Sequence, residues 1–366
     1  MAAAATGVAL VHEWLSARAG SEKTFEQMTK VLPHADVYAL TVDRSADFDI
    51  DAPVRTTVLQ RVPVLRDRRS LSLPLMPLAW KTLRTRRYHT VITSAHAFAR
   101  CIPAAKRATH LSYVYTPLRY AWLPTVDRRA AAVSRALGPA RAALRALDRT
   151  TVRHVDRFAA ISNAVRERIE EFYGREATVI FPPVDIDFFA TMPPTSEQPP
   201  VEPYVLGFSR WIPYKRLDLV IAAGAAVGMP VVIAGHGPEE AALREAAERS
   251  TVPVRFETSP DDVRLRALYR GAAALMFPAE EDFGIVPVEA QAAGTPVVAL
   301  ARGGSIDTVR SGVTGVLVPS QDVDEMADGL RRCLALPRSP EVFADHVAKF
   351  SVASFRRSFA EWITPW

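Results

Sequence analysis

EEDFGIVPVEAQAAGTPVVAL, residues 280–300, is the stretch from which the fold and a candidate site of this chain are most directly predicted. Two carboxylates, Glu281 and Glu289, are separated by seven residues and enclose a glycine loop that leads into an apolar helical pattern. The first N–H groups of a helix have no partner within the helix and attract phosphate. A carboxylate about one turn further on binds sugar hydroxyls, as the acid of dinucleotide folds does. The spacing therefore indicates a site for a sugar nucleotide.

Short apolar runs alternate with longer helical patterns along the whole chain, six runs in each half. Strand–helix alternation of this kind predicts parallel, doubly wound sheets, and two sets of six predict two Rossmann-like domains. The expected strands are Gly7–Val11, Val37–Leu40, Thr90–Ser94, His110–Tyr115, Arg157–Ile161, Thr178–Phe181, Tyr204–Phe208, Val231–Ala234, Val254–Glu257, Ala274–Phe277, Val297–Ala299 and Gly315–Val318.

Prolines mark the join between the two sets. Pro182 and Pro183 end the first set, and residues 191–203 hold five prolines in thirteen positions, which cannot pair as a central strand. We expect the hinge at about 182–203, a first domain over 1–185 and a second over 186–349. The last segment, 350–366, is predicted to be a helix that packs back across the join.

Composition sets limits on the class of protein. The chain has 366 residues, 49% of them hydrophobic and 23% charged, enough for two full cores. Its net charge of +5 divides unevenly, +11 over residues 1–185 and −6 over 186–366, so the first half is expected to meet something anionic. The sequence has no run of about 18 apolar residues, so no membrane-spanning helix is predicted. Val8 to Val11 fits a core strand better than a signal peptide. Two distant cysteines, Cys101 and Cys333, fit a reducing, cytoplasmic setting.

Two cations are expected at a strand end of the second domain. Arg210 and Lys215 lie in the segment between the strand that ends near Phe208 and the helix that follows. Ligands bind at that edge of open α/β sheets, and two cations there neutralise a diphosphate. A solvated basic loop is the alternative. Gly235, in the turn AGHGP, lets a ligand approach the backbone, although a tight turn explains this glycine equally well.

The motifs of the second domain together resemble a known family. GFSRWIPYKRLDLVI (207–221), AGHGP (234–238), LYRGAAALMFPAEEDFGIVPVEAQAAGTPVVA (268–299) and GGSIDTV (303–309) are similar, in this order, to the donor domain of retaining GT-B glycosyltransferases of family 4. They are closest to the bacterial mannosyltransferase-like subgroup. The resemblance covers most of 157–320 and implies a GT-B fold, in which two Rossmann-like domains face a central cleft.

The resemblance also assigns roles to the residues of the second domain. It implies that Glu289 holds the ribose hydroxyls, that Glu281 contacts the transferred sugar, and that Arg210 and Lys215 grip the phosphates. The backbone N–H groups expected to face the sugar and the diphosphate are those of Phe283, Gly284, Ile285 and Val286. Where the family usually has glutamate in its last motif, this chain has Asp307, a shorter acid that we leave outside the catalytic set.

The first domain is expected to hold the acceptor. Residues 12–28 resemble the family's GGAE loop with Ala19 in place of the first glycine, and Gly20 is expected to approach the donor phosphates. His96, just past a strand end, resembles a family histidine that bonds a sugar hydroxyl. A structural histidine is the alternative, and His12 is a less specific candidate.

A second stretch of the first domain departs from the family. YVYTPLRYAWLP (113–124) resembles a segment that usually reads CHTPMRYAWD, with Tyr115 in place of the histidine and Leu123 in place of the aspartate. Arg119 and Tyr120 are retained, and Arg119 is a candidate donor or acceptor contact. The two departures are expected to alter sugar or acceptor choice, or to weaken transfer.

Residues 61–89 combine eight Lys/Arg with one acid and a series of apolar side chains. Such a segment can lie on an anionic membrane surface, and by resemblance several relatives use a basic helix of this domain on lipid-linked acceptors. Core packing with a solvated face is the equal alternative. The prolines in this segment predict that its helix begins near Leu78. The Arg-rich residues 127–157 lack the aromatic platforms of a nucleic-acid groove and are predicted to form a surface helix.

These observations predict a retaining hexosyltransferase that uses a nucleoside diphosphate sugar, with GDP-mannose favoured by the subgroup, and a hydroxyl acceptor that is lipid-linked or part of a cell-envelope glycan. No cofactor and no metal are expected, and the predicted location is cytoplasmic or on the inner face of the membrane. A UDP-sugar transferase, phosphorylase or epimerase of the same fold, and a non-catalytic sugar-nucleotide-binding protein, are the alternatives.

Overall fold

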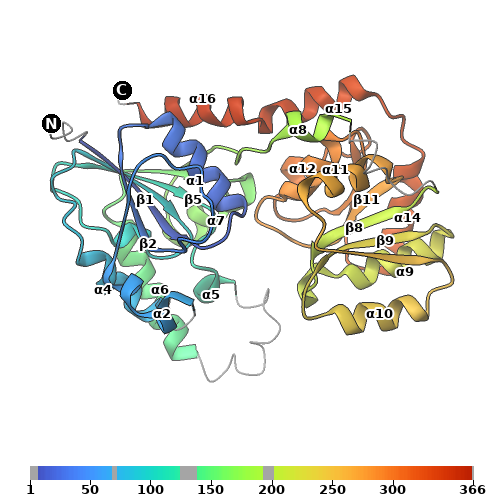
Figure 1. Cartoon of the computed structure of the whole chain (residues 1–366), viewed down its shortest axis with the longest axis horizontal. Coiled ribbons are helices and arrows are strands. Elements are labelled where there is room, and N and C mark those ends of the chain that lie inside the picture. The colour runs from blue at the N-terminus through green and yellow to red at the C-terminus, as the bar shows by residue number, and fades with distance from the viewer. Residues whose placement is uncertain (1–6, 68–71, 124–137, 193–201, 365–366) are drawn as a thin grey trace. The chain divides into compact units, whose positions relative to one another are not determined.

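The computed structural model describes residues 7–67, 72–123, 138–192 and 202–364. It divides the chain into two compact units, residues 1–183 with 355–366, and residues 184–354. Both units are layered α/β structures built on a parallel sheet (Figure 1). The assignment of the first unit to the acceptor and of the second to the donor stays a prediction.

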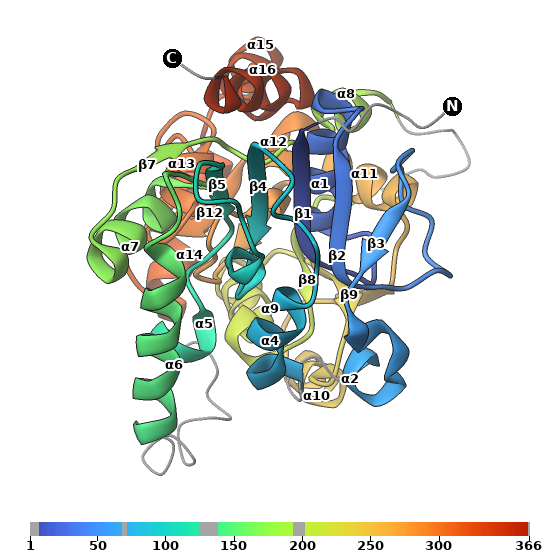
Figure 2. The same ribbon diagram turned by 90° about the vertical axis from the view of Figure 1, so that its left-hand side faces the viewer.

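The first unit contains a seven-stranded parallel sheet in the order β3-β2-β1-β4-β5-β6-β7. Figure 2 shows β2, β1, β4 and β5 side by side. Its strands are β1 (Val8–Leu15), β2 (Asp36–Val42), β3 (Val54–Thr56), β4 (Thr90–Ala95), β5 (Thr109–Val114), β6 (Arg157–Ala160) and β7 (Ala177–Val179). Its helices are α1 (Gly20–Val31), α2 (Pro63–Asp67), α4 (Met76–Lys81), α5 (Arg119–Trp122), α6 (Gly138–Val152) and α7 (Asn163–Tyr173), with 3-10 turns at Val58–Arg61 (η1), Leu73–Leu75 and Ala99–Cys101.

The second unit contains a six-stranded parallel sheet in the order β10-β9-β8-β11-β12-β13. Its strands are β8 (Val205–Arg210), β9 (Val231–His236), β10 (Val254–Thr258), β11 (Ala274–Phe277), β12 (Val297–Leu300) and β13 (Gly315–Val318). Its helices are α8 (Ile186–Ala190), α9 (Leu217–Val227), α10 (Glu240–Glu248), α11 (Asp262–Gly271), α12 (Ile285–Ala292), α13 (Ser305–Thr308), α14 (Val323–Leu334) and α15 (Pro340–Val347), with 3-10 turns at Pro213–Lys215 (η6) and Ala348–Phe350 (η7). The last helix, α16 (Val352–Ile363), begins in this unit and continues into the first.

All twelve expected strands are present, and the expected fold class of two parallel α/β domains is confirmed. One strand was not predicted: β3 reads Val-Arg-Thr, lies at the edge of its sheet and has no apolar run. The helix expected to begin near Leu78 begins two residues earlier, at Met76, so that Pro77 lies in its first turn. The N–H groups of a first turn have no partner within the helix, so a proline there removes no hydrogen bond. Of the surface helix predicted over 127–157, the structure describes Gly138–Val152, and residues 127–137 lie outside the described part.

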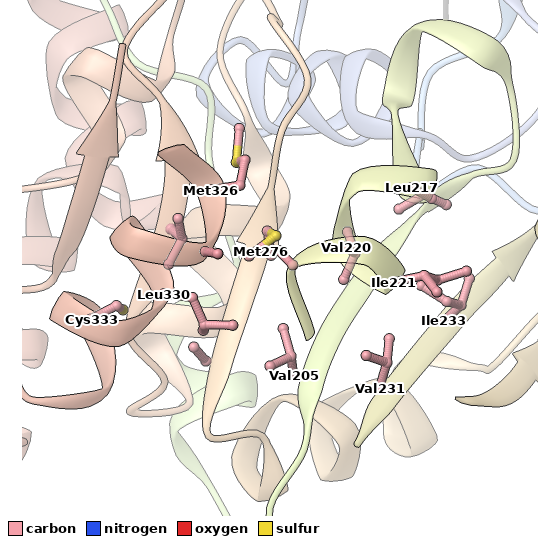
Figure 3. Packing of buried hydrophobic residues seen from close by; sticks show 14 of the residues in the cluster. Val205, Leu217, Val220, Ile221, Val231, Ile233, Met276, Met326, Leu330 and Cys333 are labelled. Atoms are coloured by element: carbon pink, nitrogen blue, oxygen red, sulfur yellow. The ribbon is translucent and has the colours of Figure 1, made fainter. Parts of the chain in front are cut away.

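The core of the second unit lies on both faces of its sheet. On one face α9 and α14 bury a continuous layer of Val, Ile, Leu and Met side chains against β8, β9 and β11, including Val205, Ile233, Met276 and Leu330 (Figure 3). On the other face α11 and α12 cover the same strands. Strands buried on both faces read as near-continuous apolar runs, which is why the sequence predicts them well.

The end of the chain packs on the first unit. The Phe355 ring of α16 lies against Tyr113 of β5, with 6.0 Å between ring centroids, and Arg357 follows on the same helix. Arg356 donates two hydrogen bonds to Oε1 of Gln27 on α1. Phe355 and Phe359 are buried, so apolar burial fixes this helix.

Within the described ranges, no helix combines the length and the apolar character needed to cross a bilayer. No group of three or more His, Cys, Asp or Glu side chains suited to a metal ion occurs in that part of the chain.

A buried histidine makes the first unit sensitive to acid. Burial of His110, on β5, lowers its pKa to about 4. The unfolded chain binds a proton below pH about 6.5, whereas the folded chain stays neutral at this residue until pH about 4. The contribution of neutral His110 to the free energy of unfolding is therefore fully present above pH 6.5. It is lost as the pH drops to about 4, and the loss is about 3 kcal/mol at most. Urea unfolding of the wild type and of His110→Leu between pH 7 and 4 tests this: the variant should lose less stability on acidification, and identical pH dependence would contradict it.

Candidate functional site

The strand order places one candidate site at the carboxyl ends of β8 and β11. In the sheet, β9 and β10 lie on one side of β8, and β11, β12 and β13 lie on the other, so the strand order reverses between β8 and β11. At such a switch point the two loops diverge and open a crevice for a ligand. Arg210 is the last residue of β8, Lys215 ends the 3-10 turn after it, and Glu281 follows β11. The structure therefore brings these three predicted residues to one edge of the sheet.

Lys215 and Glu281 form an ion pair across the switch point. The Lys215 side chain is almost fully buried, and its Nζ lies 5.0 Å from the centroid of the Tyr214 ring and 5.8 Å from that of Phe277. A buried ammonium group requires a compensating charge, and Glu281 supplies it. Arg210 is exposed and has no carboxylate partner among the residues that the structure describes. The site thus combines a fixed cation with a cation that remains accessible to solvent.

The loop between Glu281 and α12 is held by a second glycine loop. Gly284 is the N-cap of α12 and has φ of 91°, in the left-handed region that favours glycine. The Gly304 N–H donates to the Glu281 carbonyl oxygen over 2.8 Å. A Cβ atom on Gly304 would overlap the backbone of Phe283, and one on Gly303 would overlap the Glu281 carbonyl oxygen. The predicted N–H groups of residues 283–286 therefore lie in the first turn of α12 and at the end of a loop whose backbone packs directly on another backbone.

Glu289 lies one turn into α12 and is oriented by a residue that the sequence reasoning missed. The Tyr269 hydroxyl, on α11, donates to Glu289 Oε2 over 2.9 Å. The Tyr269 ring is buried against Phe189 and Phe208. Tyrosine inside an apolar helical pattern looks like a core residue, so only the position of Glu289 opposite it reveals the contact.

Gly235 has a packing reason for being glycine. Its φ is 126°, and a Cβ atom there would overlap the Ser209 carbonyl oxygen. Gly237 is similarly tight against Trp211. The structure thus accounts for this turn by its contacts with the end of β8 and with Trp211, which follows that strand. The donor-binding role of Gly235 stays a prediction.

A second cluster lies at the switch point of the first sheet, between the carboxyl ends of β1 and β4. His96, just after β4, is stacked between two aromatic side chains. Its ring is 4.3 Å from the Tyr115 ring and 5.8 Å from the Trp14 ring, each at an interplanar angle of 11°. His96 is therefore held in one orientation at the edge of the sheet where a ligand would bind.

Glu13, on β1, fixes the loop that carries His96. Its buried carboxylate accepts the backbone N–H groups of His96, Ala97, Phe98 and Ala99 at 2.5 to 3.0 Å. Burial raises the pKa of Glu13, and the N–H donors of Ala97, His96 and Ala99 together with the charge of Arg100 offset part of that effect. Sequence reasoning missed this residue because a glutamate within a strand shows no sign of the loop that it holds 83 positions away.

Tyr115, which stands where the family has histidine, links the histidines to the loop at Gly20. His12 Nδ1 and Ser94 Oγ are 2.9 Å apart, and Ser94 donates to the Tyr115 hydroxyl over 3.0 Å. That hydroxyl in turn donates to the Ser21 carbonyl oxygen over 3.0 Å. Gly20 is the first residue of α1. The departure from the family pattern therefore gives this chain a tether between β5 and the loop at Gly20.

Arg119 is the first residue of α5, a short helix anchored by a buried ion pair. Trp122 Nε1 donates to Asp148 Oδ2 over 2.8 Å, and Arg100 donates to Asp148 Oδ1 over 2.7 Å. Arg100 and Asp148 are fully buried. The side chain of Tyr120 lies outside the described part.

Two family models match the chain. The model described as Glycosyltransferase Family 4 matches residues 19–188, and the model described as Glycosyl transferases group 1 matches residues 190–350. The D-inositol 3-phosphate glycosyltransferases of Mycobacterium tuberculosis and Mycobacterium bovis are 32% identical to the chain over 247 residues, which cover 59% of this chain and 51% of theirs. The chain thus spans about half the length of these curated relatives.

Solved structures share the fold over nearly the whole chain. Anabaena HepE in complex with UDP-glucose has a TM-score of 0.70 at 18% identity, covering 97% of this chain and 99% of that chain. Sucrose-phosphate synthase from Thermosynechococcus elongatus has a TM-score of 0.73 at 18% identity, with 97% and 98% covered. These likenesses confirm the expected GT-B fold.

Replacement of Gly304 by alanine should disturb the loop that precedes α12. The new methyl group would overlap the Phe283 backbone, so the loop must move, and overpacking of this kind costs about 1–3 kcal/mol. We expect a lower melting temperature and weaker binding of GDP or UDP, measured by calorimetry. Gly138→Ala is the control, since a Cβ atom there meets nothing within 4 Å. Unchanged nucleotide binding in Gly304→Ala would show that the loop does not bear on the ligand.

Tyr269→Phe removes the hydroxyl that orients Glu289 and leaves the packed ring in place. A lost hydrogen bond to a charged group costs about 1.5–3 kcal/mol, so nucleoside diphosphate affinity should fall about tenfold or more. Tyr204→Phe is the matched control, because Tyr204 is buried in the same hydrophobic cluster and donates to the Leu268 carbonyl oxygen instead. Isothermal titration measures the nucleoside diphosphate affinity of both variants. An equal loss of affinity in the two would show that the Tyr269 hydroxyl acts only through the stability of the core.

Proposed function

We propose, since the chain belongs to the GT-B glycosyltransferases, that it transfers a hexose from a nucleoside diphosphate sugar to an acceptor hydroxyl with retention of configuration. The observation that carries this proposal is the Lys215–Glu281 ion pair at the β8/β11 switch point, next to the glycine loop that opens α12. Cation, carboxylate and helix N-terminus are the groups that a diphosphate and a sugar need.

Each group of the site has a part in the proposed reaction. Arg210 and Lys215 neutralise the diphosphate as it leaves, and the N–H groups of residues 283–286 bind its oxygens and the sugar. Glu289 holds the ribose hydroxyls, and Glu281 binds the transferred hexose while keeping Lys215 in place. The sequence shows no pair of carboxylates that is recognisable as a covalent nucleophile and its acid partner. We therefore propose front-face substitution, in which the departing phosphate accepts the acceptor proton.

GDP-mannose is the proposed donor, on the resemblance of the motifs to the mannosyltransferase-like subgroup. A UDP-sugar is the second candidate, because a structure with the same fold is that of HepE in complex with UDP-glucose. The donor contacts proposed above are to the diphosphate and the ribose, which both donors share. The base is thus the part of the donor that a binding panel must identify.

The proposed acceptor is a lipid-linked or cell-envelope glycan presented at an anionic membrane surface. Of the eight large hydrophobic side chains that are exposed in the described part of the chain, five lie within residues 58–78: Val58, Val62, Val64, Leu75 and Leu78. Basic residues accompany them in 61–89. Exposed apolar side chains beside Lys and Arg suit the interface of an anionic bilayer.

Glu289→Ala and Lys215→Ala should each lower donor-dependent transfer at least about 100-fold, since each removes a charged contact to the donor. Release of nucleoside diphosphate from GDP-mannose, UDP-glucose, ADP-glucose and dTDP-glucose, with and without acceptor, measures this. Glu240→Ala, which removes a half-exposed glutamate of α10, is the control and should keep wild-type activity.

Wild-type turnover in either site variant would overturn the site assignment. Consumption of a UDP-sugar without acceptor, or only with inorganic phosphate, would indicate an epimerase or a phosphorylase. Nucleotide binding without turnover of any donor would indicate a non-catalytic sugar-nucleotide-binding protein.

A further inference from the structure

Tyr115 comes directly after β5 and lies beside the end of β4. Its N–H donates to the Ala95 carbonyl oxygen over 3.1 Å, so its backbone continues the pairing of the two strands. The side chain is therefore placed at the carboxyl edge of the first sheet, next to His96. Because the family segment has histidine at this position, the contacts of Tyr115 are a departure from the family pattern.

Burial divides the side chains of this cluster into two groups. His12, Ser94 and Tyr115 are buried, whereas His96 and Trp14 are partly exposed. His96 is thus the histidine of the cluster that a ligand can reach. The three buried side chains can influence a reaction only through the groups that they hold.

The protons of the buried hydrogen bonds have a single order. The Tyr115 hydroxyl donates its only proton to the Ser21 carbonyl oxygen, which cannot donate in return. The Tyr115 oxygen accepts from Ser94, which uses the only proton of that hydroxyl. His12 Nδ1, 2.9 Å from Ser94 Oγ, must therefore be the donor in that pair. Neutral His12 is thus the tautomer with its proton on Nδ1 and a lone pair on Nε2.

The direction of this chain of hydrogen bonds depends on a protonated Tyr115. Burial raises the pKa of Tyr115, so its hydroxyl keeps its proton at neutral pH. The carbonyl oxygen at one end and the imidazole at the other are thereby linked by Ser94 and Tyr115 alone.

The ring of Tyr115 makes a second contribution, to His96. The two rings are stacked with centroids 4.3 Å apart and planes at 11°. The His12 ring meets that of His96 edge-on, with centroids 6.0 Å apart and planes at 73°. One tyrosine therefore supports the accessible histidine by its ring and sets the proton of the adjacent buried histidine by its hydroxyl.

We propose that Tyr115 is a positioning residue for sugar transfer: its ring holds His96, and its hydroxyl sets the tautomer of His12 through Ser94. The inference rests on the proposed transferase function and assigns a role to a residue whose type departs from the family pattern. Core packing is the alternative role for this buried side chain. A core residue affects stability, but it does not select the tautomer of His12.

The experiment compares Tyr115→Phe, which keeps the ring and removes the hydroxyl, with a matched control on the same strand. Tyr113→Phe is the control, because Tyr113 is fully buried and its hydroxyl donates to the Ile180 carbonyl oxygen over 2.9 Å. Each variant thus loses one buried hydroxyl that is bonded to a backbone oxygen. Ser94→Ala is a second test variant, since it interrupts the same chain of hydrogen bonds and leaves Tyr115 in place.

Two measurements are made on each full-length protein. Histidine ¹⁵N chemical shifts at a pH of about 8, where an ordinary histidine is neutral, report the tautomer of His12. The variant His12→Gln identifies its signal. Release of nucleoside diphosphate from GDP-mannose and from UDP-glucose gives kcat and KM, and calorimetry gives the affinity for GDP and UDP.

His12 should carry its proton on Nδ1 in the wild type and in Tyr113→Phe. In Tyr115→Phe and Ser94→Ala the proton order is lost, and the signal should shift toward the tautomer protonated on Nε2. We expect kcat of Tyr115→Phe to fall about fivefold or more, the effect of one lost hydrogen bond, with nucleotide affinity unchanged within about twofold. Tyr113→Phe should keep kcat within about twofold of the wild type.

Protonation of His12 on Nε2 in the wild type, or an unchanged tautomer in both Tyr115→Phe and Ser94→Ala, would overturn the inference. So would unchanged kcat in Tyr115→Phe, or an equal loss of kcat in Tyr113→Phe.

The tautomer measurement needs no substrate, so it separates this inference from the function on which it rests. A wild type that turns over neither donor contradicts the proposed function, and the tautomer of His12 then decides the role of Tyr115 by itself. Normal turnover with no change of tautomer in the test variants contradicts the inference alone.

Discussion

The candidate donor site depends on the contact between two backbone segments that pack without a side chain between them. Gly304 lies against Phe283 and donates its N–H to Glu281, and neither Gly303 nor Gly304 has room for a Cβ atom. This contact sets the path of the chain before α12, and with it the direction of the N–H groups at the start of that helix. The carboxylate of Glu289 follows one turn later, oriented by Tyr269. The loop is thus shaped before any ligand arrives, which reduces the entropy lost on binding.

In the first unit, the loop at the end of β4 is held by a side chain and not by backbone packing. The loop after β4 is gathered by the carboxylate of Glu13, which accepts four consecutive backbone N–H groups, and His96 is clamped between two aromatic rings. A loop held by one buried carboxylate depends on that group far more than a loop held by close backbone packing. Removing a partner from a buried hydrogen-bond network leaves several polar groups unsatisfied.

The sequence allowed prediction of the sheets because strands buried on both faces are apolar throughout, as in Val231–Ala234. It failed at β3, whose three residues pair at an edge and need no apolar run. Among the site residues, Glu281 and Lys215 were recognised from strand ends, and their contact follows from the strand order. Glu13 and Tyr269 were missed because their partners lie 83 and 20 positions away and only the fold brings them together.

A crystal structure of the full chain with GDP or UDP bound would show whether the loop before α12 is the nucleotide site. We expect the ribose hydroxyls within hydrogen-bond distance of the Glu289 carboxylate, about 2.6–3.2 Å, and the diphosphate against the N–H groups of residues 283–286 and the side chains of Arg210 and Lys215. A nucleotide bound elsewhere on the chain, with no contact to Glu289 or to this loop, would contradict it.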